Sequence, residues 1–144
     1  MNEVKYEQYF YGWTQEQARL LREGRFAELD VANVVEEIET LGRGERRELV
    51  SHLNVLLTHL LKWAYQPERR SRSCRLAIEA QRLQRHQHLQ ENPSLKVFLD
   101  EAMELAYRLA LIEAERQTRL SPKRFPSSCP WSFDPAITDD FWPA

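Results

Sequence analysis

Apolar residues recur at every third or fourth position along most of this chain, and only helical folds bury residues with that spacing on one side. No segment shows the strict alternation of a half-buried strand. The pattern predicts five helices, at about residues 6–22, 30–41, 45–65, 71–91 and 93–118. Gly24 and Gly42 are expected to end the first two helices, while Asp30 and either Ser71 or Ser73 are expected to cap the second and fourth.

The fifth predicted helix carries an apolar stripe that is expected to face the core and to include Leu105 and Leu109. After Leu120 the chain becomes rich in proline and aromatic residues, which excludes a long helix but permits one short turn capped by Asp134. Buried aromatic rings are expected to hold this segment on the helices. Residues 121–144 are called the C-terminal strap below.

Short connections between successive helices favour antiparallel neighbours. We therefore expect an all-α fold, an up-and-down helical bundle of about five helices with an extended, aromatic-rich C-terminal strap. The length of 144 residues suits a single domain, with residues 1–120 forming the bundle and 121–144 packed on it.

Charge and cysteine usage restrict the classes of partner. The net charge of -2 gives no overall attraction to nucleic acid or to an anionic membrane. The two cysteines, Cys74 and Cys129, form no zinc or disulfide pattern, and no stretch is apolar enough to be a signal peptide or a membrane span. These observations predict a bacterial-style cytoplasmic protein that does not bind a membrane and needs no cofactor.

Five segments extend over nearly the whole chain: Tyr6–Trp13, Glu36–Gly42, His59–Ser73, Glu91–Leu95 and Asp139–Pro143. Together they resemble a bacterial family, the domain of unknown function numbered twenty-nine. Cys74 departs from the aromatic residue expected at that position. The resemblance implies a helical fold, but it supplies no activity and no catalytic residue.

Four arginines surround the predicted start of the fourth helix: Arg69, Arg70, Arg72 and Arg75. A helix N-terminus carries partial positive charge, so each nearby cation is unfavourable by about 0.3–1 kcal/mol unless an anion is present. The cluster therefore suggests binding of a phosphate or a nucleic-acid backbone. Internal pairing with glutamates, or plain solvation of a basic turn, is the alternative.

Three side chains that can bind metal lie along one border of the third predicted helix: Glu48, His52 and His59. The two histidines are separated by about 10.5 Å along the axis, which is awkward for one zinc ion. Histidines that simply flank the core are the alternative. No motif for a catalytic nucleophile or a phosphate loop occurs. The sequence therefore leans against an enzyme and leaves a metal-dependent enzyme as a distant alternative.

The fourth predicted helix has two apolar sides. Cys74, Ile78 and Leu89 share one side with several polar residues, and Leu76, Ala80 and Leu83 lie on the other. If the first side packs on the bundle, the second is free to bind a second copy of the chain or another protein. Burial of both sides within one chain is the alternative. We therefore interpret the chain as a small helical protein–protein interaction module, with anion binding through the arginines as the alternative function.

Overall fold

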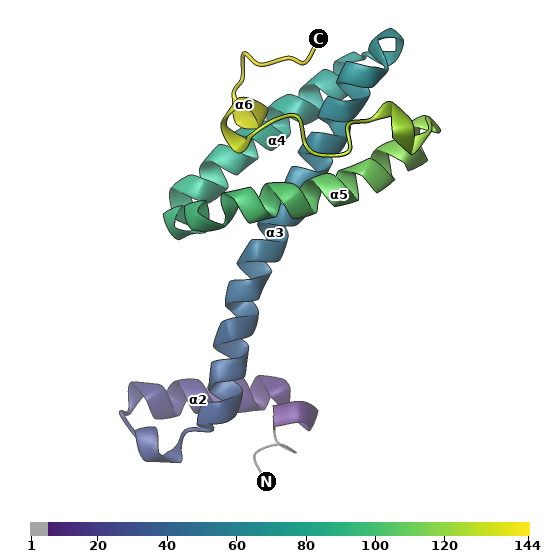
Figure 1. Ribbon diagram of the computed structural model, residues 1–144. Coiled ribbons are helices and arrows are strands. Elements are labelled where there is room, and N and C mark those ends of the chain that lie inside the picture. The colour runs from purple at the N-terminus through teal and green to yellow at the C-terminus, as the bar shows by residue number, and fades with distance from the viewer. Residues whose placement is uncertain (1–5) are drawn as a thin grey trace. The chain divides into compact units, whose positions relative to one another are not determined.

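The computed structural model describes residues 6–144, and within that range all regular structure is helical (Figure 1). The all-α prediction is therefore confirmed. Short 3₁₀ turns connect the longer helices, at Phe26–Glu28, Pro67–Arg69, Pro93–Phe98 and Pro122–Arg124. The α-helices are α2 (Phe10–Arg22), α3 (Val31–Tyr65), α4 (Arg72–Glu91), α5 (Leu99–Thr118) and α6 (Phe133–Ile137).

Helix α3 runs without a break through a segment where two helices were expected. The prediction that Gly42 ends a helix is wrong. A glycine ends a helix by taking a left-handed conformation, as Gly24 does after α2 with φ of 71°. Gly42 has no such positive φ and stays within the helix.

The described chain falls into two compact units, divided after Gly44. In the first unit, Asp30 organises the turn between α2 and α3. Its carboxylate accepts hydrogen bonds from Trp13 Nε1 at 2.9 Å and Asn33 Nδ2 at 2.8 Å, and its backbone amide donates to Gln17. Burial favours the protonated form of Asp30, but the hydrogen bonds from Asn33 and Trp13 outweigh it and hold the pKa of this carboxyl below its ordinary value.

The second unit is an up–down–up arrangement of the latter part of α3, α4 and α5, with α6 beside α4 (Figure 1). Helix α4 is antiparallel to α3, since contacts join Cys74 to His59 and His88 to Glu45. Helix α5 is parallel to α3, because Arg46 binds Glu101 at 3.1 Å and Lys62 binds Gln117 at 3.0 Å, with the same offset of residues in both pairs.

The core of the second unit is built from leucines of α3 and small residues of α5. Leu49, Leu53, Leu56, Leu57, Leu60 and Leu61 are all fully buried. Helix α5 buries Ala102, Ala106, Ala110 and Ala114, which recur every fourth position and allow close packing. Leu105 and Leu109, expected in the core, are instead exposed, because α5 turns its alanine side inward.

The C-terminal strap contributes its own buried residues to this core: Phe125, Phe133, Ala136 and Ile137. The short helix α6 begins after Ser132, not after Asp134 as expected. Tyr107 of α5 donates a hydrogen bond to the Pro126 carbonyl at 2.6 Å. The strap is thus part of the packed unit.

Arg82 of α4 is fully buried and holds the end of the strap. Its Nε donates to the Ala136 carbonyl at 2.9 Å, and its two terminal nitrogens donate to the carbonyls of Asp139 at 3.4 Å and Phe141 at 2.6 Å. The guanidinium also lies 5.1 Å from the ring centre of Trp142. One side chain of α4 therefore binds four residues of the strap.

Within residues 6–144, no helix is both long enough and apolar enough to cross a membrane.

Candidate functional site

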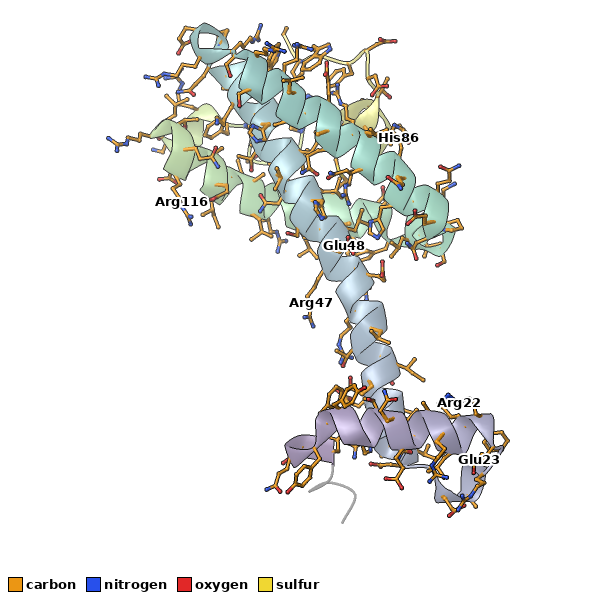
Figure 2. The ribbon with its side chains drawn as sticks, turned by 180° about the vertical axis from the view of Figure 1, so that it is seen from behind. Arg22, Glu23, Arg47, Glu48, His86 and Arg116 are labelled. Atoms are coloured by element: carbon orange, nitrogen blue, oxygen red, sulfur yellow. The ribbon has the colours of Figure 1, made fainter. Side chains whose placement is uncertain are left out.

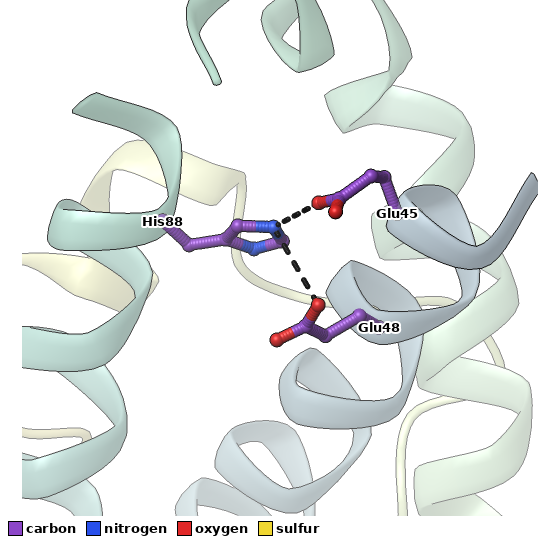
Figure 3. Close-up of side chains that lie close together, drawn as sticks. All are labelled: Glu45, Glu48 and His88. Atoms are coloured by element: carbon purple, nitrogen blue, oxygen red, sulfur yellow. Dashed lines mark hydrogen bonds and ion pairs between the residues drawn. The ribbon is translucent and has the colours of Figure 1, made fainter. Parts of the chain in front are cut away.

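Polar side chains from α3 and α4 meet at the border of the second unit (Figure 3). His88 Nε2 lies 2.9 Å from Glu45 Oε2 and 4.0 Å from Glu48 Oε2. On the other side of the ring, Arg85 Nη1 lies 3.3 Å from His88 Nδ1. Arg85 is only 2% exposed, and burial lowers the pKa of its guanidinium while the charge of Glu48 opposes that shift. Glu45, Glu48, Arg85 and His88 are called the α3–α4 polar cluster below.

The ligand atoms of Glu45, Glu48 and His88 all lie within 4.8 Å of one another, which is close enough for one metal ion. The position of Arg85 bears on that chemistry, because arginine can only donate hydrogen bonds. His88 Nδ1 must therefore accept, which places the ring proton on Nε2, where it donates to Glu45. A metal on Nε2 would instead require a proton on Nδ1, facing the guanidinium. The geometry favours a histidine that joins Arg85 to Glu45 through its two ring nitrogens.

The residues of the predicted metal site are only partly brought together. His52 Nε2 lies 3.9 Å from Glu48 Oε1, one turn apart on α3. His59 instead lies beside Cys74, with 3.7 Å between His59 Nδ1 and Cys74 Sγ. Burial lowers the pKa of both imidazoles, so both favour the neutral form. A shared metal on Glu48, His52 and His59 stays an untested hypothesis.

The pair of Cys74 and His59 has the atoms of a nucleophile and a base, but its environment opposes that chemistry. Burial raises the pKa of the Cys74 thiol, although the charge of Lys62 partly offsets this. Burial also lowers the pKa of His59. Both shifts favour a neutral thiol next to a neutral imidazole, whereas catalytic cysteines depend on the thiolate.

The four arginines around the start of α4 differ in what they contact. Arg75 pairs with Glu79 at 2.8 Å. Arg70 donates to the Trp63 carbonyl at 2.8 Å and lies 5.0 Å from the ring centre of Trp63. The side chains of Arg69 and Arg72 are exposed and make no hydrogen bond or ion pair within the part of the chain that the structure describes.

Arg70 belongs to a stack of side chains that fixes the end of the strap. Trp63 and Trp142 lie 4.7 Å apart between ring centres, with Arg70 beside the first ring and Arg82 beside the second. Ser71 caps α4 as predicted, because its side chain accepts from the Cys74 amide at 3.1 Å. Any anion at this turn would therefore be bound mainly by Arg69 and Arg72.

The strip of Leu76, Ala80 and Leu83 is exposed on α4, with 43% of Leu76 and 69% of Leu83 accessible.

His86 lies on the side of α4 that faces α6, where its Nε2 is 3.0 Å from the Ile137 carbonyl (Figure 2). His86 and His88 therefore point to different sides of the helix, as their spacing requires.

Sequence reasoning did not identify Glu45, Arg82 and Arg85 as members of polar contacts. A signal existed for the two arginines. Arg82 and Arg85 fall at helical spacing between Ile78 and Leu89, which belong to the buried side of α4. A charged residue on a buried side needs a partner, but the pattern could not say which distant segment supplies it.

These features define a small all-α protein whose polar clusters hold helices and strap together. The model of the domain of unknown function DUF29 matches residues 5–142, so the chain belongs to that family. The resemblance stated from the sequence is confirmed. No curated protein and no solved structure matches this chain.

Proposed function

We propose that this chain is a small helical protein–protein interaction module. The observation that carries the proposal is that residues 6–44 expose many more large apolar side chains than they bury. Among the described residues of this unit, Trp13 and Leu20 are the buried hydrophobic side chains. Many more large apolar side chains are exposed there: Tyr9, Phe10, Tyr11, Leu21, Phe26, Val31, Val35, Ile38 and Leu41. Such an excess of exposed over buried apolar side chains favours an interaction site.

The strip of Leu76, Ala80 and Leu83 on α4 is the second surface that supports the proposal. It lies opposite the side through which α4 buries Cys74 and Ile78. A partner covering Leu83 would remove about 70 Å² or more of apolar surface from water, worth roughly 2 kcal/mol. Because this strip is apolar and exposed, it supports a role in binding either a second copy or another protein.

Photo-crosslinking in the cells that make the protein tests the proposal. A photoreactive residue at position 38 or 83 is expected to give a covalent adduct with one defined protein, either the chain itself or another. The same residue in place of Gln15, an exposed polar position of α2, is the matched control. Leu83→Asp is added to the chain labelled at position 38, and Ile38→Asp is added to the chain labelled at position 83. Loss of the adduct in both would show that the surfaces around Ile38 and Leu83 bind the same partner together. Labelling no stronger than at position 15 would contradict the proposal.

A second candidate function is binding of a phosphate or nucleic-acid backbone at the start of α4. The exposed and unpaired Arg69 and Arg72 support it, since guanidinium groups bind phosphate in a bidentate way. Filter binding at low salt is expected to show retention that falls steeply with added salt. The variant Arg69→Glu with Arg72→Glu should lose it, and Arg108→Glu on α5 is the control. Absence of retention by the native chain at low salt would rule this function out.

A further inference from the structure

The first part of α3 carries an apolar stripe that the rest of its unit leaves uncovered. Val31, Val35 and Ile38 recur at steps of four and three, and the next step of four reaches Gly42. Val31 is 58% exposed, Val35 is 45% and Ile38 is 62%, and Leu41 at the edge of the stripe is 72%. Tyr6, which precedes α2, donates a hydrogen bond to Glu37 on a different side of α3. The stripe is therefore available to another chain.

Gly42 is a second, independent observation on the same stripe. Glycine within a helix is less stable than alanine by about 1 kcal/mol. An added Cβ at Gly42 would meet no atom within 4 Å, so nothing in its own chain requires glycine there. The same holds for Gly44, which lies on the opposite side of the helix. Close approach of a second helix to the stripe would give Gly42, but not Gly44, a reason to lack a side chain.

The order of charged residues along this segment indicates which partner helix can pack on the stripe. Glu36, Glu37 and Glu39 come before Gly42, and Arg43 and Arg47 come after it. Glu45 and Arg46 also come after it, but they bind His88 and Glu101 of the second unit. Figure 2 shows Arg47 extended away from the helix. Two copies paired antiparallel would place acidic residues beside basic ones, whereas parallel pairing would place like charges together. The segment is therefore complementary to a reversed copy of itself.

We propose that two copies of this chain pair through antiparallel α3 segments around a two-fold axis. Ile38 of each chain packs over the partner's Gly42, and Glu36 of each chain pairs with the partner's Arg43. Within one chain, Arg43 lies 3.3 Å from Glu36 and 3.7 Å from Glu39, and all three side chains are exposed. Exposed pairs of this kind are weak, so exchanging them across the axis costs little. This inference rests on the proposed interaction function and names its partner as a second copy.

Two glycine variants test the contact between helices. Sedimentation of the full chain is expected to show a concentration-dependent dimer of the 17.1 kDa monomer. Gly42→Ala should weaken the dimer by at least about tenfold in Kd, because overpacking a helix contact costs more than 1 kcal/mol. Gly44→Ala should change Kd by less than about twofold. Both variants should keep or gain helical circular dichroism, because alanine favours helix, so loss of folding cannot imitate the result.

Two charge variants test the antiparallel register. Glu36→Arg and Arg43→Glu should each be monomeric alone, because each places two like charges together across the axis. Mixed in equal amounts, they should form a heterodimer, because every contact then joins opposite charges. A parallel dimer would already place like charges together in the native chain, so neither variant alone would dimerise less than the native chain does; loss in both single variants therefore marks the antiparallel register.

The outcomes separate this inference from the function on which it rests. A native chain that stays monomeric at every concentration overturns the inference, and so does a dimer equally sensitive to both glycine variants. If crosslinking at position 38 still captures a different protein, the interaction function stands while the pairing of copies fails. If neither a dimer nor an adduct forms, both fail.

Discussion

Removal of residues 121–144 is expected to lower the melting midpoint of the chain by roughly 15–20 °C or to abolish cooperative unfolding. The strap buries Phe125, Phe133 and Ile137 against the core. Burial of three such side chains contributes about 6 kcal/mol, and the whole free energy of unfolding of a domain is about 5–15 kcal/mol. A change of 1 kcal/mol shifts the midpoint by about 3 °C at this chain length.

Polar groups add to this loss. Without the strap, Arg82 loses all three carbonyl acceptors and the strap residues that cover it. The hydroxyl of Tyr107 loses the Pro126 carbonyl, and burial already raises the pKa of that phenol by disfavouring its charged form. Each hydrogen bond lost in this way contributes about 0.5–1.5 kcal/mol of stability, and more where the donor is charged.

Thermal unfolding followed by circular dichroism measures the effect of the truncation. The double variant Ser127→Ala with Ser128→Ala alters two exposed strap residues and is the matched control, expected to change stability by less than about 0.5 kcal/mol. A truncated chain that melts within a few degrees of the full chain would show that the strap is dispensable.

The helical class and the buried leucines of α3 could be predicted because they depend on spacing alone. Leu53, Leu56 and Leu60 repeat at helical intervals, and all three are fully buried. The buried side of α5 could not be predicted in the same way. Leucine at positions 105 and 109 is more hydrophobic than alanine, but the alanines allow closer packing, and that choice depends on the neighbouring helix.

The continuity of α3 shows a second limit of sequence reasoning. Glycine ends a helix only when the following chain turns away, and the residues around Gly42 alone do not show whether it does. The α3–α4 polar cluster shows a third limit. Glu45 and His88 are far apart in sequence, and their contact depends on the antiparallel pairing of α3 and α4. The individual residues were visible, but the pairing that joins them is a tertiary property.

The variant Arg82→Ala is expected to lose about 3–5 kcal/mol of stability, or roughly 10–15 °C in melting midpoint. Its side chain is fully buried and donates to three strap carbonyls, so its removal leaves those acceptors without a donor and opens a cavity. Arg75→Ala on the same helix is the control. Arg75 makes an exposed pair with Glu79, for which about 0.5 kcal/mol is expected.

The role of Arg82 as the anchor of the strap can be separated from a general loss of packing by two further measurements. Arg82→Lys keeps a positive charge but lacks the planar fork that reaches three carbonyls, so it should recover only part of the stability. Hydrogen exchange at residues 136–142 should speed up in Arg82→Ala before exchange in α3 does, because the strap is released first. Removal of a local anchor should loosen first the segment that the anchor holds. If exchange in α3 and in the strap becomes faster by the same factor, Arg82 stabilises the whole unit and is not a specific anchor of the strap.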